Sequence, residues 1–83
     1  MPIVAIVEGV KIVFYFNEHP PHDFHAKIAE HQAVIDIELL RLAAGSLPVA
    51  KRRKVLAWTS TRQAALRKAF YAAIAREPVE PIE

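Results

Sequence analysis

The stretch Val10-Lys11-Ile12-Val13-Phe14-Tyr15-Phe16 decides the fold of this chain of 83 residues. Its β-branched and aromatic residues are typical of a β-strand, and so are those of the preceding stretch Ile3-Val4-Ala5-Ile6-Val7. Glu8-Gly9 separates the two stretches, and Gly9 can adopt the positive φ that a tight turn requires. The sequence therefore predicts a β-hairpin over residues 3–16.

A second pair of strands is predicted after a polar loop. Residues 17–23 contain two prolines, which is typical of a loop, and the following arms are Phe24 to Ile28 and Ala33 to Ile37. In the second arm Ala33, Ile35 and Ile37 share one face. Residues 39–43 are candidates for a short fifth strand.

The second half of the chain is predicted to be helical. Gly45 interrupts the preceding element, Ser46 is a suitable N-cap and Pro48 fits the first turn. The first helix then extends to about Trp58.

A second helix is predicted from about Thr61 to Arg76. Ser60-x-x-Gln63 matches a capping box at its start, and one continuous bent helix is the alternative. An apolar stripe at helical spacing is formed by Leu66, Ala69, Phe70, Ala73 and Ile74. The aromatic side chains Trp58, Phe70 and Tyr71 are predicted to lie in the core or between the helices.

Strands followed by helices, without βαβ alternation, indicate an α+β fold. We expect an antiparallel four- to five-stranded sheet of two hairpins, followed by two C-terminal α-helices packed on one face. Residues 1–76 form this single domain, and residues 77–83 form an acidic, proline-containing tail that is expected to be mobile. The apolar strand over residues 3–7 would promote aggregation as an uncovered edge, so a homodimer or a partner protein is expected.

The composition excludes several classes of protein. The chain has no cysteine, which rules out a disulfide framework, a thiolate zinc site and thiol catalysis. Neither a signal peptide nor a membrane span is recognisable, so a cytoplasmic protein without a membrane partner is expected.

The formal net charge of +2 conceals a strong division along the chain. Residues 1–38 hold two cations and six anions, residues 39–76 hold nine cations and no anion, and residues 77–83 hold three anions. The predicted sheet and tail are therefore acidic, and the predicted helices are basic.

The basic helices are candidates for binding nucleic acid or an acidic protein. The cations proposed for this role are Lys51, Arg52, Arg53, Lys54, Arg62, Arg67 and Lys68. Alternatively, these residues form a solvated helix face that the acidic half of the same chain partly neutralises.

Three of the four histidines lie within seven residues, at His19, His22 and His25. Imidazole nitrogens suit a divalent transition metal such as zinc, and prolines in the same loop would lower the entropic cost of holding ligands in place. The residues that could complete the coordination are Glu18, Asp23 and His31.

The same histidines allow two other interpretations. A neutral and a protonated imidazole beside Lys27 could cleave a phosphodiester without metal, which would make the protein a small ribonuclease. The structural alternative is a stiff polar loop in which Glu18 or Asp23 accepts hydrogen bonds from the imidazoles.

Several segments together resemble a known family. They are Asn17-Glu18-His19, Pro20-Pro21-His22, His25-Ala26, Ala33-Val34-Ile35-Asp36-Ile37-Glu38, Gly45-Ser46-Leu47-Pro48 and Val55-Leu56-Ala57-Trp58. The chain is similar, from about Met1 to Ile74, to short bacterial proteins grouped as domain of unknown function 4160 (DUF4160). His19 and His25 match the family pattern, whereas Pro20-Pro21-His22 comes one position early and Asp23 compensates for the shift.

The resemblance implies a role but no chemistry. It implies a component of a two-gene, toxin–antitoxin-like module with a small protein partner encoded nearby. No catalytic residue can be transferred from the family.

Overall fold

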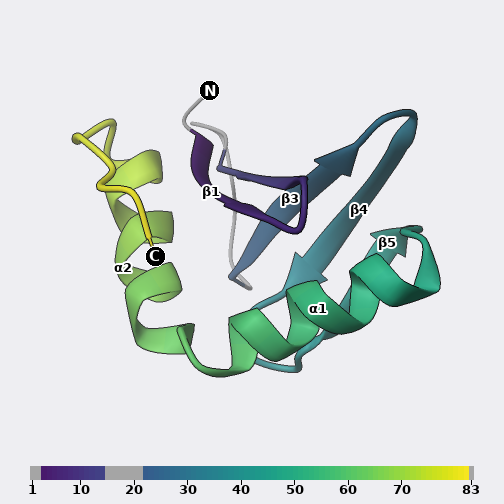
Figure 1. Cartoon of the computed structure of the whole chain (residues 1–83). Coiled ribbons are helices and arrows are strands. Elements are labelled where there is room, and N and C mark those ends of the chain that lie inside the picture. Colours follow the sequence, from purple (N-terminus) through teal and green to yellow (C-terminus); the bar gives the residue numbers. More distant parts are fainter. Residues whose placement is uncertain (1–2, 15–21, 83) are drawn as a thin grey trace.

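The computed structural model describes residues 3–14 and 22–82 and has an α+β fold, as predicted (Figure 1). Five antiparallel strands pair in chain order, and two helices follow them. The elements are β1 (Ile3–Val7), β2 (Val10–Val13), β3 (Asp23–Ile28), β4 (His31–Asp36), β5 (Arg41–Gly45), α1 (Val49–Ser60) and α2 (Gln63–Ile74). Neither helix has the length and apolar character needed to cross a membrane, within the residues described.

Short turns connect β1 to β2, β3 to β4 and β4 to β5. Glu8 and Gly9 join β1 to β2 with φ values of 51° and 81°, the positive pair that a type I′ hairpin turn uses. The predicted first hairpin is therefore confirmed, but its second strand ends at Val13, and Tyr15 and Phe16 of the predicted strand lie outside the described residues. Ala29 between β3 and β4 also has a positive φ, of 52°, which is unfavourable for a residue with a Cβ atom.

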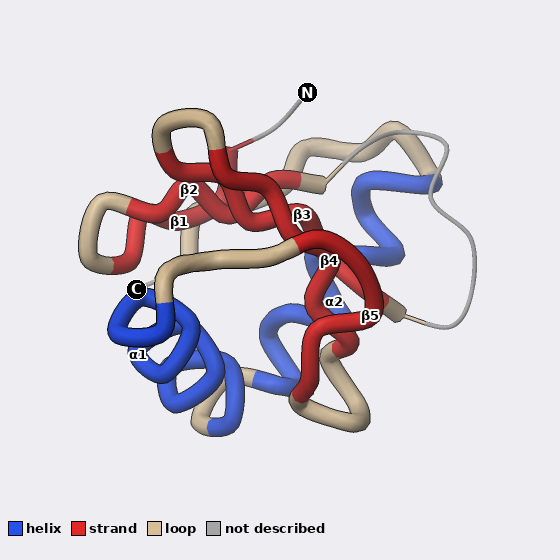
Figure 2. The backbone as a smooth tube through the Cα atoms, turned by 90° about the vertical axis from the view of Figure 1, so that its right-hand side faces the viewer, coloured by secondary structure: helices blue, strands red, loops and turns tan. Residues whose placement is uncertain are grey.

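Both helices cover the same face of the sheet (Figure 2). Along one cross-strand row, Ile12, Ala26 and Ala33 are buried, whereas the adjacent residues Lys11 and Gln32 are exposed. This alternation shows which face the helices cover and which face meets solvent.

Aromatic rings from both halves of the chain meet in the core. The rings of Phe24 and Phe70 each contact the ring of Phe14 edge-to-face, with centroids 6.3 and 6.2 Å apart. All three side chains are fully buried. Trp58 packs against the core as predicted, but Tyr71 is 51% exposed, so its predicted burial is wrong.

The link between sheet and helices differs from the predicted one. β5 begins and ends two residues later than the expected fifth strand, and Gly45 is its last residue. The N-cap of α1 is Pro48 and no side chain caps this helix, so the Ser46 cap is wrong. The Ser46 amide instead donates to the carbonyl of Gln32 at 3.0 Å, which ties the link to β4.

The helices are separate, but the predicted capping box between them is absent. Gln63 is the first residue of α2, and its side-chain amide donates to the carbonyl of Ile37 at 2.9 Å. The Ser60 hydroxyl donates to the carbonyl of Ala57 at 2.7 Å. Both side chains therefore satisfy carbonyl groups elsewhere rather than cap the helix.

The chain reverses direction after α2. Arg76 has a φ of 58°, its amide donates to Ala73, and the Glu77 amide donates to Ala72 at 2.9 Å. This pair of hydrogen bonds is the Schellman motif, in which glycine normally occupies the position of Arg76. Residues 77–82 then return without helix between α2 and β1 (Figure 1).

Candidate functional site

The exposed cations of α1 form the first candidate site. Arg52, Arg53 and Lys54 are exposed, and we call these three residues the α1 basic cluster. Lys51 differs from them, because its ammonium group donates to the carbonyl of Glu8 at 2.8 Å and so holds α1 against the β1–β2 turn.

The electrostatics of α1 make its basic cluster unusual. The helix contains no acidic residue, and no side chain caps its N-terminus. The amide groups at a helix N-terminus carry partial positive charge, so a cation in the first turn is unfavourable by about 0.3–1 kcal/mol. Of the cluster, Arg52 lies in this turn, next to Lys51, and Arg53 and Lys54 follow it. Among the described residues, no carboxylate pairs with Arg52, Arg53 or Lys54. The charge of this cluster is therefore directed to solvent or to a partner.

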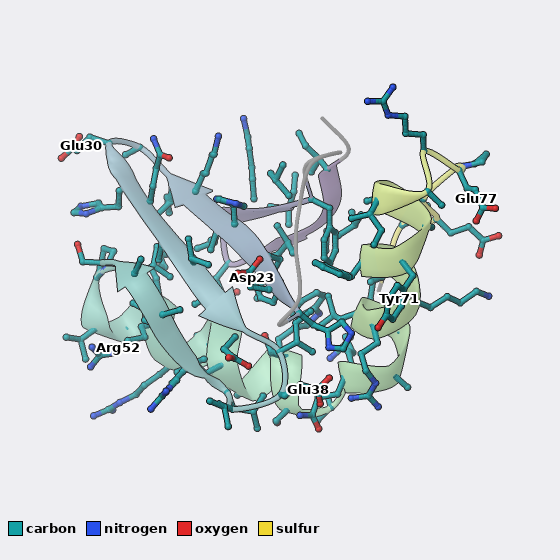
Figure 3. All side chains as sticks on the ribbon, turned by 180° about the vertical axis from the view of Figure 1, so that it is seen from behind. Asp23, Glu30, Glu38, Arg52, Tyr71 and Glu77 are labelled. Atoms are coloured by element: carbon teal, nitrogen blue, oxygen red, sulfur yellow. The ribbon has the colours of Figure 1, made fainter. Side chains whose placement is uncertain are left out.

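The predicted cations of α2 have different surroundings. Arg67 pairs with Glu38, with Nη1 at 3.0 and 3.1 Å from the two carboxylate oxygens. The Arg62 guanidinium lies over the Trp58 ring, 5.2 Å from its centroid. Lys68 is exposed. Arg52 on α1 and Tyr71 on α2 lie on opposite sides of the molecule (Figure 3), so the seven predicted cations do not form one continuous patch.

His22 is the centre of the second candidate site. Its Nε2 atom lies 2.7 Å from the hydroxyl oxygen of Tyr71, and its Nδ1 atom lies 3.3 Å from a carboxylate oxygen of Glu38. The rings of Phe70 and Tyr71 contact the imidazole edge-to-face, each at 5.1 Å between centroids. We call His22, Glu38, Arg67 and Tyr71 the His22 cluster.

Two parts of the fold position the partners of His22. The Asp36 carboxylate accepts hydrogen bonds from the amides of Glu38 and Leu39, each at 2.8 Å, and so shapes the turn that carries Glu38. Arg67 and Tyr71 are four residues apart on α2 and lie on one face of that helix.

The geometry assigns a chemical role to each member of the cluster. With Nδ1 protonated toward Glu38, the Tyr71 hydroxyl donates a hydrogen bond to the Nε2 lone pair of His22. This arrangement joins a carboxylate, an imidazole and a phenol, with the Arg67 guanidinium beside the carboxylate. It suits proton transfer at a surface-accessible hydroxyl group.

Neither His25 nor His31 joins His22. His25 is half-buried on β3, where its register partners are Val13 and Val34, and His31 lies 4.0 Å from Glu30 at the far end of β4. His19 lies outside the described residues. Within residues 3–14 and 22–82, no three potential metal ligands of the His, Cys, Asp or Glu type come together.

Sequence reasoning identified His22 but missed Glu38 and Tyr71 as its partners. The spacing of Arg67 and Tyr71, four residues apart in a predicted helix, indicates that these two residues share one helix face. Nothing in the spacing connects His22 with Tyr71, because the two residues are 49 positions apart.

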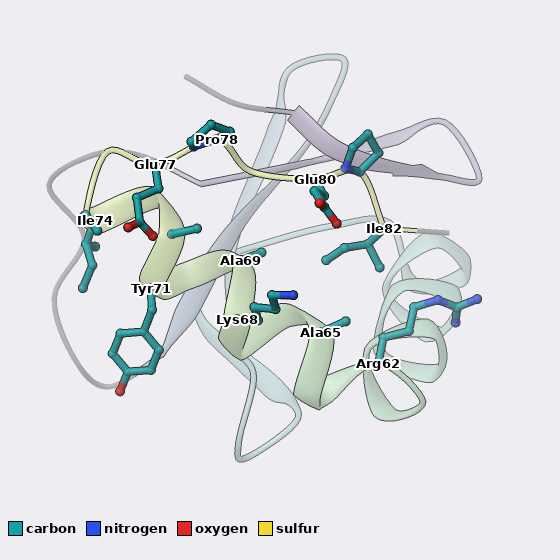
Figure 4. A pocket seen from close by; sticks show the side chains of 13 residues that line it. Arg62, Ala65, Lys68, Ala69, Tyr71, Ile74, Glu77, Pro78, Glu80 and Ile82 are labelled. Atoms are coloured by element: carbon teal, nitrogen blue, oxygen red, sulfur yellow. The ribbon is translucent and has the colours of Figure 1, made fainter.

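A groove lies between α2 and the C-terminal segment (Figure 4). Its volume is about 1160 Å³. Alanine side chains of α2 line its floor, cations of α2 and of its N-cap line one wall, and carboxylates of the C-terminal segment line the other. The principal residues are Ala65, Ala69, Arg62, Lys68, Glu77 and Glu80.

A family model described as "Domain of unknown function (DUF4160)" matches residues 9–70. The match contains the α1 basic cluster together with His22, Glu38 and Arg67, and it ends one residue before Tyr71. No curated protein and no solved structure matches the chain. The predicted family resemblance is confirmed.

Proposed function

This chain belongs to the DUF4160 family, and we propose that it binds an acidic macromolecule through the α1 basic cluster. In this proposal it is one component of a toxin–antitoxin-like module in the cytoplasm. Its partner is a small cognate protein or a nucleic acid.

The observation that carries the proposal is the unfavourable placement of the cluster. Three exposed cations lie in the N-terminal half of a helix that has neither an acidic residue nor a capping side chain. The three like charges repel one another, and no described carboxylate compensates for them. A partner rich in carboxylates or phosphates would remove this repulsion, because its negative charge attracts all three cations.

A pull-down of the untagged protein from its host tests the proposal. We expect Arg53→Glu/Lys54→Glu to lose the partner, and wild type to release it as salt increases. Treatment with nuclease before elution distinguishes the two classes, because a nucleic acid disappears and a protein remains. Retention of the same partner by the double variant would contradict the proposal.

A second candidate function is RNA cleavage at the His22 cluster, favoured by the Glu38–His22–Tyr71 geometry. After Tyr71 moves off Nε2, His22 would take the proton of a ribose 2′-hydroxyl. The 2′-oxygen bonds to phosphorus, the bond from phosphorus to the 5′-oxygen breaks, and Tyr71 protonates the leaving oxygen. The proton held by His22 then returns to Tyr71.

An assay with a fluorescent RNA tests this second function. We expect His22→Gln and Tyr71→Phe to lose cleavage, whereas His31→Gln, a control outside the cluster, retains it. If wild type cleaves the RNA and both His22→Gln and Tyr71→Phe cleave it at the same rate, the His22 cluster is excluded as the active site.

Addition of zinc tests the metal interpretation in parallel. A rise in melting temperature that His19→Ala/His25→Ala removes would support it, and an unchanged melting temperature would contradict it.

A further inference from the structure

The C-terminal segment, residues 77–82, contacts the edge of the sheet. The Ile82 amide donates to the carbonyl of Val4 on β1 at 2.7 Å. Val79 and Ile82 are partly buried and pack against the hydrophobic core. This segment lies beyond residues 9–70, which the family model matches, so the family match gives no role for it.

β1 is an edge strand with unusual apolar exposure. It pairs only with β2 in the sheet order, and Ile3 and Ile6 are 47% and 65% exposed. The outward carbonyl groups of an edge strand accept hydrogen bonds from any extended segment that lies beside them. Ile82 forms one such bond, so the C-terminal segment uses β1 as a peptide ligand uses the edge of a binding domain.

The groove beside this contact has charged walls of opposite sign. Lys68 and Arg62 belong to the α2 wall, whereas Glu77 and Glu80 belong to the segment. The Glu80 side chain points from the segment toward α2 (Figure 4). Without the segment, the surface that remains has the cations Lys68 and Arg62 beside alanines of α2. An extended chain with alternating acidic and apolar residues complements this remaining surface in both charge and polarity.

The attachment of the segment is weak in comparison with that of the strands. Its backbone contact with β1 is the single hydrogen bond of Ile82 among the described residues. The chain enters the segment through Arg76, which has a positive φ and is not glycine. Release of the segment breaks the hydrogen bond of Ile82 and leaves all five strands paired.

We propose that residues 77–82 are an intramolecular ligand of a peptide-docking site formed by the β1 edge and the α2 groove. When the segment leaves, the site binds an extended acidic and apolar segment of a partner protein. The occupied site is therefore autoinhibited. This inference goes beyond the proposed function, because it concerns another surface and does not require the α1 basic cluster.

A labelled peptide with the sequence of residues 77–83, Glu-Pro-Val-Glu-Pro-Ile-Glu, is the probe. Its binding to full-length protein is measured by fluorescence anisotropy. Val79→Ser/Ile82→Ser removes the apolar anchors of the segment, and we expect this variant to bind the peptide at least about tenfold more tightly than wild type. The reason is that a tethered ligand competes at an effective concentration of about millimolar.

Two further variants make the test specific. Lys68→Glu, added to the anchor variant, should reverse the gain, because it replaces a cation of the groove with an anion. Arg53→Glu/Lys54→Glu in the same background should keep the gain, so that failure of the α1 proposal and failure of this one are distinguishable.

Equal affinity of wild type and the folded anchor variant would overturn the proposal, and so would the absence of binding to both. If the anchor variant does not fold, Glu77→Lys/Glu80→Lys replaces it. Both glutamates are exposed, and their reversal repels the segment from α2 without removing a core contact. The same tenfold gain is then expected, and its absence overturns the proposal.

Discussion

Charge reversal on α1 should weaken partner binding without lowering stability. Lys51 and Lys54 are three residues apart on the helix, so Lys54→Glu replaces a repulsive pair with an attractive one. Each such pair is worth about 0.2–0.5 kcal/mol, so this change alone stabilises the folded state by about 0.4–1 kcal/mol. Arg53 is exposed and lies beyond the first turn, so Arg53→Glu should have little effect on stability.

The effect on binding has the opposite sign. An exposed ion pair contributes about 0.2–1 kcal/mol, and reversal replaces each attraction with a repulsion. For Arg53→Glu/Lys54→Glu the loss is about 1–4 kcal/mol, at least about fivefold in the dissociation constant. We therefore expect the melting temperature to stay the same or rise by a few degrees while the captured partner is lost.

The matched control is Lys11→Glu/Lys27→Glu, which changes the net charge by the same amount. These lysines are register partners on the open face of the sheet. The pair is like-charged as Lys–Lys in the α1 variant and as Glu–Glu in the control, so its repulsion is similar in both. Differential scanning fluorimetry measures stability, and the salt-dependent pull-down measures binding. The reasoning is refuted if the control loses the partner equally, or if the α1 variant loses binding only together with stability.

Three further predictions concern the turns. Gly45→Ala should destabilise the protein by about 2–4 kcal/mol in urea denaturation. Residue 45 has a φ of 74°, and the added Cβ atom would lie 2.2 Å from the carbonyl oxygen of Gln32. An unchanged urea midpoint would contradict this prediction. Arg76→Gly should stabilise it by about 0.5–1 kcal/mol, since glycine relieves the positive φ but increases the entropy of the unfolded chain; a lower melting temperature would show that the Arg76 side chain matters more. Asp36→Ala should lower the free energy of unfolding by about 1–3 kcal/mol, because it removes the acceptor of two amide groups. In NMR spectra the Glu38 amide resonance should shift, while the Gly45 amide keeps its native resonance. Unchanged stability would disprove the role of this turn.

The order and type of the elements were predictable because local composition decides them. The apolar stretches flanking Glu8-Gly9 predicted the first hairpin, and the helical spacing of Leu66 and Phe70 predicted the buried side of α2. Such signals lie within a few residues of one another. They can therefore be interpreted without knowledge of the tertiary structure.

The boundaries and the site were less predictable because distant groups determine them. Gln63 was assigned to a capping box, but its amide bonds the carbonyl of Ile37, which is 26 positions away. Tyr71 was assigned to the core or the helix interface, but its hydroxyl group bonds His22 at the surface. In both cases a hydrogen-bond partner from another element outweighs the local pattern.

The serial order of the strands has a consequence for the folding pathway. Every pair of neighbours in the sheet is also consecutive in the chain, so each hairpin closes only a short loop, and low contact order favours fast folding. The bond between Ile82 and Val4 is the extreme exception, because it spans nearly the whole chain. Closing so long a loop costs the most entropy, so we expect the sheet and helices to assemble first and Ile82 to join Val4 last. In equilibrium hydrogen exchange, the Ile82 amide should accordingly exchange well before the amides that pair β3 with β4.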